Sequence, residues 1–154
     1  MKKLAHVAGV LTLTAGLLTA VFAGSASACS CPPGGEGEKF QRADHVFSGL
    51  VLAKVLEAGD PSTSLDDLNR FVLLVGTEYK GRVPRVVSVT SAVQGATCGV
   101  EMLERRRYVV FATGDAADRR VEATLCGGTR LADSGPPVTT TSTPVTTTCA
   151  TATS

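Results

Sequence analysis

The fold of this chain depends on the stretch ASACSCPP at residues 26–33, in which two cysteines stand one residue apart. All five cysteines of the chain lie within or after this stretch, at Cys29, Cys31, Cys98, Cys126 and Cys149. In an exported protein such cysteines usually form a framework of disulfides. Whether they do so here depends on whether the chain is exported.

The segment 1–28 has the pattern of a secretory signal peptide. Lys2 and Lys3 give a positive start, residues 4–23 form an apolar run, and Ala26-Ser27-Ala28 is an A-x-A cleavage site. We therefore expect cleavage before Cys29 and a secreted, extracellular product that has left the membrane.

Two other interpretations of this segment remain open. The apolar run is long enough to span a bilayer and to be retained as an anchor, but the small residues after it favour cleavage. A cysteine at the first mature position is also where a cell-surface lipoprotein carries its lipid. That signal has Leu three positions before the cysteine, where this chain has Ala26. We rank both interpretations below simple cleavage.

Four of the cysteines fall in the part of the chain that we expect to fold. A bond between Cys29 and Cys31 would close a very small ring, which conflicts with ordinary disulfide geometry. We therefore expect one of them to pair with Cys98 and the other with Cys126. In the chain-entropy model, each loop of such length stabilises the fold by roughly 4 kcal/mol. The alternative is a redox or soft-metal site, which needs reduced thiols that an oxidising compartment disfavours.

The charge balance gives no sign of a nucleic-acid or membrane partner. The chain has 15 Lys and Arg against 14 Asp and Glu, and loss of Lys2 and Lys3 with the signal leaves 13 against 14, a net charge of −1. A nearly neutral protein lacks the basic footprint that nucleic acids and anionic membranes attract. No second apolar run in the sequence reaches membrane-spanning length.

The middle of the chain has the pattern of a small, mostly β domain. Apolar periodicity and turn signals predict a short helix at 36–43, with Phe40 and Ala43 on one side. They also predict five strands, at 45–55, 70–80, 86–90, 107–113 and 120–125. The first strand carries apolar residues on both faces, so we expect both faces to be buried. Several short strands separated by turns favour a small closed or half-closed barrel.

Residues 133–154 differ in composition from the rest and are rich in Thr, Pro and Ser. A segment with so few apolar residues cannot build a core, so we expect a disordered tail after a single domain at 29–132. Cys149 stands alone in this tail, and we expect it to be unpaired or bonded to another molecule.

The sequence carries none of the common signatures of an enzyme. The mature part has one histidine, His45, inside a predicted strand and without the companions of a metal site. It has no glycine-rich phosphate loop and no nucleophile motif. The carboxylate pairs Glu36/Glu38 and Asp66/Asp67 are more simply explained as solvated surface than as acid–base groups. We therefore expect a protein that is not an enzyme and holds no cofactor.

Four features follow one another in a specific order between residues 29 and 131. The mature chain would begin Cys29-Ser30-Cys31 with Pro33 two places on, and a short helix and strand follow at 40–55. A Cys98-Gly99 pair stands 69 positions after Cys29, and the strand Tyr108-Val109-Val110-Phe111-Ala112 precedes Cys126. In this order and spacing the chain resembles the tissue inhibitors of metalloproteinases and the wider netrin-like module.

The resemblance implies a fold and a mechanism. The fold is an OB-like barrel of five strands with a short N-terminal helix, pinned by Cys29–Cys98 and Cys31–Cys126 disulfides. In inhibitory members the N-terminal residue blocks a zinc protease, so the backbone amine and carbonyl of Cys29 would chelate the target's zinc in trans. The other contacts implied are Ser30 in the adjoining substrate pocket, Cys31 and Pro32 along the cleft, and Ala96 and Thr97 as a second ridge.

The chain departs from this family in three ways. A Thr-rich tail stands where the family has its second, cysteine-knotted domain, and the Gly often found before the strand at 108–112 is replaced within Glu104-Arg105-Arg106-Arg107. The loop 57–69 has no residue that matches a contact of the family. Our main hypothesis is a secreted inhibitor of a zinc metalloproteinase. The alternatives are a netrin-like extracellular binding or cell-surface module without inhibitory activity and, third, an extracellular thiol protein that uses the Cys29/Cys31 pair.

Overall fold

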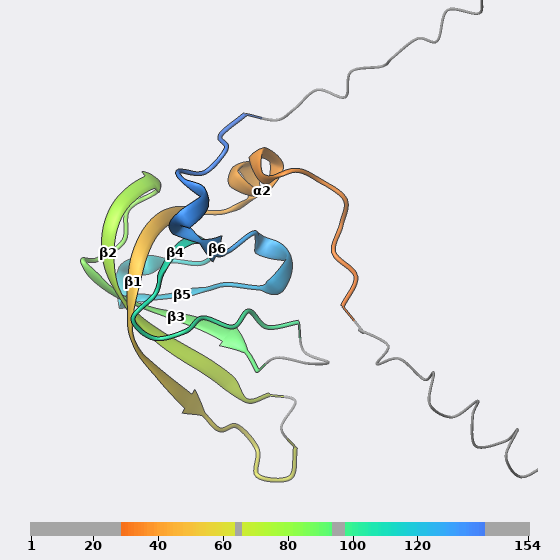
Figure 1. Ribbon diagram of the computed structural model, residues 1–154. Coiled ribbons are helices and arrows are strands. Elements are labelled where there is room, and N and C mark those ends of the chain that lie inside the picture. The colour runs from red at the N-terminus through yellow and green to blue at the C-terminus, as the bar shows by residue number, and fades with distance from the viewer. Residues whose placement is uncertain (1–28, 64–65, 94–97, 141–154) are drawn as a thin grey trace, which may run out of the picture.

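The computed structural model describes residues 29–63, 66–93 and 98–140. They form a strongly twisted β-sheet with one short helix packed against part of it (Figure 1). The predicted signal peptide at 1–28, and residues 141–154 with Cys149, lie outside the described residues. In the described part of the chain, no helix is long and apolar enough to cross a membrane.

Six strands make up a single sheet in the order β5-β3-β2-β1-β4-β6. Neighbouring strands are antiparallel except β3 and β5, which are parallel. In chain order they are β1 (His45–Glu57), β2 (Leu68–Lys80), β3 (Val86–Ala92), β4 (Arg107–Ala112), β5 (Arg120–Glu122) and β6 (Arg130–Leu131). The helix α2 (Glu36–Arg42) precedes them, and the 3₁₀ turns are η2 (Ala116–Asp118), η3 (Leu125–Gly127) and η4 (Ala132–Ser134).

The expected mostly β class with one short helix is confirmed, but the strand bounds differ. β1 and β2 extend towards each other beyond the predicted ends, because their ladder continues to the pair Glu57–Leu68. The last predicted strand, 120–125, stops at Glu122 because the chain then turns into η3. The sixth strand, β6, was not expected, since only two residues pair there with β4.

Two apolar clusters stabilise the sheet. The larger lies on its inner face, and its most deeply buried members are Phe47, Val51, Phe71, Leu73, Val87, Val89, Met102 and Val110. The smaller lies beneath α2, where Phe40 and Ala43 pack on Val46, Val109 and Phe111. Burying a side chain of this size stabilises a fold by about 2 kcal/mol. Phe40 and Ala43 therefore fix the helix on the sheet, on the side of the helix that the sequence predicted.

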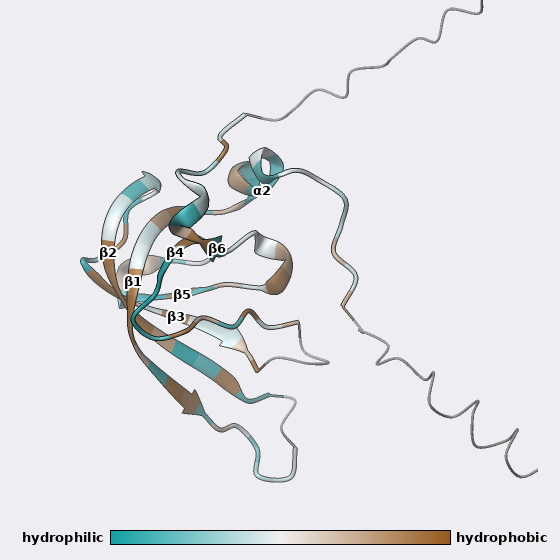
Figure 2. Cartoon of the chain, viewed as in Figure 1, coloured by the Kyte–Doolittle hydropathy of each residue, from teal (hydrophilic) through white to brown (hydrophobic). Residues whose placement is uncertain are grey.

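We expected β1 to be buried on both faces, and this is correct only for its first half. Val46 lies under α2 and is fully buried, but Leu52 is 48% exposed and Val55 is 40% exposed. The reason is that α2 has only seven residues and covers only the start of the strand. Apolar residues nevertheless continue to the far end of β1, as its brown tip in Figure 2 shows.

The strand ladder is open, with β5 and β6 at its two ends. One isolated antiparallel bridge joins Thr113, directly after β4, to Glu122 at the end of β5. Each of these residues donates its N–H to the other's carbonyl at 2.9 Å. The bridge therefore brings the ends of β4 and β5 together, although the two strands form no continuous ladder.

A shared carboxylate fastens the far end of the β1–β2 hairpin to β5. Glu57 accepts a hydrogen bond from Nε of Arg70 at 2.6 Å and another from Nη2 of Arg120. Desolvation by itself would raise the pKa of Glu57. The hydrogen bonds and positive charges of the two arginines outweigh it and hold the pKa below the usual 4.5.

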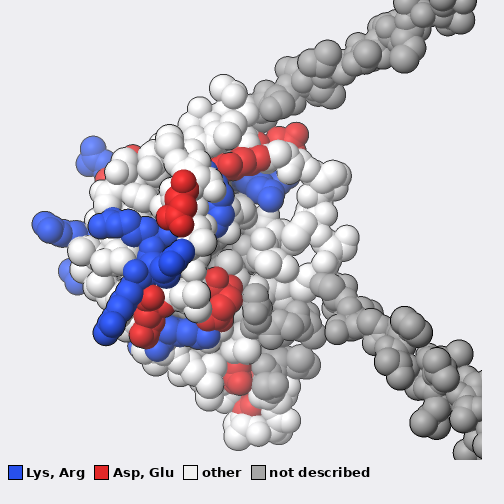
Figure 3. Space-filling view, in the orientation of Figure 1, with Lys and Arg blue, Asp and Glu red and all other residues white. Residues whose placement is uncertain are grey.

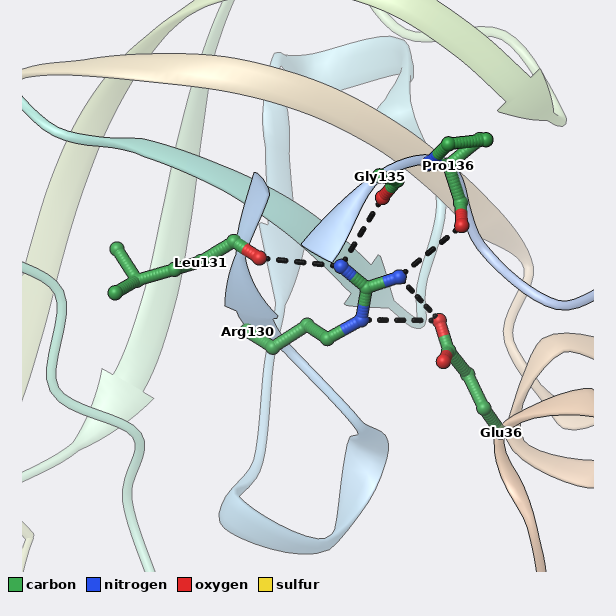
Figure 4. A network of polar contacts seen from close by, with 5 residues as sticks. All are labelled: Glu36, Arg130, Leu131, Gly135 and Pro136. Atoms are coloured by element: carbon green, nitrogen blue, oxygen red, sulfur yellow. Dashed lines mark hydrogen bonds and ion pairs between the residues drawn. The ribbon is translucent and has the colours of Figure 1, made fainter. Parts of the chain in front are cut away.

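The residues just before the predicted tail hold part of that tail in place. Arg130 donates from Nε and Nη2 to Oε1 of Glu36, at 3.1 and 2.9 Å (Figure 4). Nη1 donates to the carbonyls of Leu131 and Gly135, both at 3.1 Å, and Nη2 to that of Pro136 at 3.2 Å. A guanidinium has five N–H donors, and five contacts satisfy them all.

Residues 133–140, the described part of the tail that composition predicts to be disordered, make further contacts with the domain. Pro137 is buried, and Nε2 of Gln41 on α2 donates to the carbonyl of Thr139 at 3.1 Å. Composition predicted disorder because the segment has few apolar residues. The contacts with Arg130 use the backbone carbonyls of Gly135 and Pro136, which the composition of a segment does not reveal.

Replacing Glu57 by Gln should lower the free energy of unfolding at neutral pH by about 1 kcal/mol or less. Because folding lowers the pKa of Glu57, its contribution is complete above the unfolded value of 4.5 and is lost as the pH falls through the lower folded value. Urea unfolding of both proteins from neutral pH down to about pH 3 tests this. The exposed Glu38→Gln is the control. A difference that vanishes already well above pH 4.5 would contradict the prediction.

Ending the chain after Ser134 should lower the free energy of unfolding by roughly 1–3 kcal/mol, relative to a chain that ends after Thr140. The shorter chain removes two carbonyl acceptors from Arg130 and the buried Pro137. Both truncations lack residues 141–154, so the comparison isolates the described segment. Equal thermal and urea unfolding curves for the two chains would show that residues 135–140 add nothing to stability.

Candidate functional site

Residues 29–35 connect the first cysteine to α2 without forming helix or strand. Cys29 is half-buried, while Ser30, Cys31 and Pro32 are exposed. Four of the residues implied as inhibitory contacts are thus described, and three of them lie on the surface. The other two, Ala96 and Thr97, lie outside the described residues.

Two disulfides fix this segment to the sheet. Cys29 is bonded to Cys98 with a Cα–Cα distance of 5.5 Å, and Cys31 is bonded to Cys126 with a Cα–Cα distance of 5.2 Å. These are the same two pairs that the family resemblance implies. They cross-link residues 69 and 95 positions apart in sequence. Ser30 is the single residue between the two attachment points.

The first attachment point lies in a closely packed part of the fold. Cys98 has a positive φ of 58°, and its carbonyl accepts the N–H of Leu125 at 2.9 Å. The N–H of Val100 donates to Oγ of the buried Ser91 in β3 at 2.8 Å. Gly99 between them approaches the backbone of β3 so closely that a Cβ atom would lie 1.6 Å from the carbonyl oxygen of Ala92. Cys98 is therefore held by β3 on one side and by the chain near η3 on the other.

The second attachment point is joined directly to the first. Cys126 lies in η3, whose Gly127 donates its N–H to the carbonyl of Thr124 at 3.0 Å. An antiparallel bridge pairs Thr124 with Gly99. The segment is bonded to Cys98 and Cys126, and both of these cysteines lie close in sequence to the Gly99–Thr124 bridge. The positions of Cys29 and Cys31 are set relative to each other by this single unit.

A small pocket opens beside the second disulfide, between α2 and the end of β4. Its lining includes Cys126, Gly127 and Phe111, with Lys39 and Arg42 from the helix and Glu122 from β5. Ala43 and Phe111 supply apolar side chains to the lining, and Lys39, Arg42 and Glu122 supply charged ones. The surface next to residues 29–32 is therefore hollowed rather than flat.

No group of three or more His, Cys, Asp or Glu side chains in the described residues could hold a metal ion. His45 lies at the start of β1, where its Nε2 is 3.0 Å from the carbonyl oxygen of Gly114. Its Nδ1 is buried and has no partner among the described residues. His45 therefore contacts the turn after β4. In the sheet it pairs with Ala112 of β4 and not with a residue of the disulfide-bonded segment.

Sequence reasoning missed the residues that support the two half-cystines. Ser91, Gly99 and Thr124 are separated along the chain and carry no motif, so only the fold brings them together. The nearest signal in the sequence is the Cys98-Gly99 pair itself, because a glycine next to a half-cystine can mark a close backbone approach.

Comparison of the sequence with models of known protein families found no match, and comparison with curated proteins found no significant match.

Replacing Gly99 by Ala should lower the free energy of unfolding by more than about 3 kcal/mol or prevent folding, because the methyl group would overlap a backbone carbonyl rather than a movable side chain. Gly35→Ala is the matched control, since a Cβ at that position meets nothing within 4 Å. Both proteins are compared by urea unfolding under oxidising conditions. A Gly99→Ala protein as stable as the control would show that Cys98 is not held as described.

Proposed function

We propose that this protein is an exported inhibitor of zinc metalloproteinases, related to the tissue inhibitors of metalloproteinases and the netrin-like module, and not an enzyme. The observation that carries the proposal is the attachment of residues 29–31. Cys29 and Cys31 are bonded to one backbone unit, and Ser30 is exposed between them. A short, rigid, exposed segment is what a protein needs to occupy another protein's cleft with little loss of conformational entropy.

The proposed architecture is an OB-like barrel of five strands. Strands β4, β1, β2, β3 and β5 are adjacent in this order, and the Thr113–Glu122 bridge links the outermost two. This bridge supports closure of the five strands on themselves, with β6 as an addition to β4. Under this proposal the domain is 29–132, the signal peptide is 1–28, and the chain is secreted rather than lipid-anchored.

The proposed chemistry begins with cleavage before Cys29. The new α-amine has an ordinary pKa near ~8, which is low enough for a zinc ion to displace its proton. Its lone pair and the carbonyl oxygen of the same residue would then bind the zinc of the target together. They would occupy the coordination position of the water that attacks the substrate. The inhibitor supplies backbone atoms only and needs no metal or cofactor of its own.

The neighbouring residues would make the remaining contacts. Ser30 would enter the pocket that receives a substrate side chain, and Cys31 and Pro32 would continue along the cleft. Residues 96 and 97 directly precede Cys98, whose Cα lies 5.5 Å from that of Cys29. This short distance supports a second contact ridge made by Ala96 and Thr97 next to the N-terminus.

Adding one Ala before Cys29 of the mature protein should weaken inhibition of a susceptible zinc endopeptidase by roughly 100-fold or more, because loss of a zinc ligand costs several kcal/mol. Acetylation of the α-amine should have the same effect. Both proteins should keep their unfolding curves, since the disulfides use the side chain of Cys29 and not its amine. The measurement is the inhibition constant against a panel of zinc endopeptidases.

The same assay includes two variants of the exposed residue. Ser30→Arg should inhibit less well, because its charge would have to be desolvated in the substrate pocket, and Ser30→Ala serves as the matched control. If the extended protein inhibits as well as the mature one, chelation is wrong. If the mature protein inhibits none of the panel, the netrin-like binding module without inhibitory activity replaces this proposal.

A further inference from the structure

The outer face of the sheet carries a second surface that the proposed function does not use. The strand registers place residues of neighbouring strands side by side on one face. One such row across β4, β1, β2 and β3 is Arg107–Leu50–Leu74–Val86. The next, across β1, β2, β3 and β5, is Ala53–Val72–Ser88–Arg120. The inner core residues Leu73, Phe71 and Val87 alternate with them and point the other way.

Six aliphatic residues on this side form what we call the outer apolar face: Leu50, Leu52, Val55, Val72, Leu74 and Val86. Leu52 lies at the register shift between Val51 and Ala53, next to the second row. Leu52, Val55 and Val86 are 48%, 40% and 44% exposed, and the other three are half-buried. Isolated exposed apolar residues are ordinary, but a continuous group over three strands marks an interaction site.

Positive charge borders the outer apolar face. Arg107 ends the first row, and its Nη1 would lie 3.6 Å from a Cβ placed on Gly76, so the guanidinium extends over β2. Arg85 lines an open groove together with Leu74 and Gly76. Neither arginine forms an ion pair with any described residue. Figure 3 shows Lys and Arg side chains, with Asp and Glu side chains among them, on the side of the molecule where β1 and β4 lie.

Three carboxylates near this face have partners other than Arg85 and Arg107. Glu57 is held between two arginines. Glu78 in the groove accepts the N–H of Val83 at 2.7 Å, and Glu104 accepts the N–H of Lys54 at 2.9 Å. Arg85 and Arg107 have no ion-pair partner among the described residues, and an occupant with carboxylates would supply one.

The part of the sheet that α2 covers indicates the shape of that occupant. There α2 covers the outer face by packing Phe40 and Ala43 on Val46, Val109 and Phe111. The outer apolar face continues the same surface along β1, β2 and β3, and no helix within the described residues covers it. We propose that it docks an acidic amphipathic helix of a partner protein, with aliphatic residues toward the sheet and carboxylates toward Arg85 and Arg107.

Two other occupants fit the observations less well. A second copy of this chain, docked face to face, would bring the unpaired arginines of both copies together, which costs free energy. A lipid surface requires side chains that reach about 5–10 Å into the headgroup region, and aromatic residues are typical there. The outer apolar face consists of aliphatic side chains set within a sheet and includes no aromatic residue.

The probes are two synthetic amphipathic helical peptides with the same leucine face, one with glutamates and one with lysines on the flanks. They are titrated into the folded, oxidised, ¹⁵N-labelled protein, and backbone amide shifts are recorded. We expect the glutamate peptide to shift amides of β1, β2 and β3, to bind more weakly as salt is added, and to bind about tenfold or more tightly than the lysine peptide.

Two pairs of variants locate the contact. Leu74→Thr should weaken binding of the glutamate peptide about tenfold, whereas Leu125→Thr, at an exposed apolar residue outside the outer apolar face, should not. Arg107→Glu should weaken binding by a similar factor, whereas Arg42→Glu on α2 should not. Unfolding curves of all four variants check that they fold, and Arg107→Glu tests the surface even if Leu74→Thr is unstable.

The inference is overturned if neither peptide binds at millimolar concentration, if the two bind equally well, or if the shifts map to other elements. It is also overturned if the protein sediments as a dimer that Leu74→Thr dissociates, which would assign the face to a second copy. Binding to phosphatidylglycerol vesicles that depends on Leu74 would assign it to lipid instead. None of these outcomes bears on inhibition, because residues 29–32 do not contribute to the outer apolar face.

Discussion

The structure depends on one covalent constraint: two cysteines a single residue apart are bonded to two half-cystines that a backbone bridge holds together. The bonded residues are 69 and 95 positions apart in sequence, so each bond removes much conformational freedom from the unfolded chain. The described domain has a modest core with no Trp to fill it. The cross-links thus supply stability that such a core lacks, and they also define the shape of the exposed N-terminal segment.

The remaining contacts extend this constraint into the sheet. α2 begins five positions after Cys31. The ammonium group of Lys80 in β2 donates to the carbonyls of Phe40, Gln41 and Ala43 at the end of this helix, at 3.0, 2.8 and 2.6 Å. The helix is therefore attached by apolar packing on one side and by a cation at its carboxyl end. At the other end of the sheet, Glu57 links β1 to β2 and β5. Each junction joins segments that are distant along the chain.

Much of the fold could be predicted from the sequence, because alternation along 45–55 and 70–80 and the turn residues between strands are local signals. What could not be predicted depends on partners across the sheet. β1 and β2 extend to Glu57 and Leu68 because these two residues pair with each other. β6 forms because its two residues pair with the edge of β4. The composition of residues 133–140 predicts disorder. It gives no sign of their contacts with Arg130, because the acceptors are backbone carbonyls, which every sequence has. At the candidate site, the sequence indicated Cys29 to Pro32, but not the support from Ser91, Gly99 and Thr124.

The position of Arg130 has a mechanical consequence. Its guanidinium holds the first residue of α2 and the carbonyls of Gly135 and Pro136 at once. A pulling force applied beyond Thr140 meets the bond from Gln41 to Thr139 and then the Arg130 contacts, so it acts on α2 and β6, where it must break hydrogen bonds. Residues 29–31 lie outside this route, and two covalent bonds tie them to Cys98 and to Cys126 in η3. A molecule tethered to a surface by its C-terminal end would bear the strain of that tether without changing the geometry of the segment around Ser30.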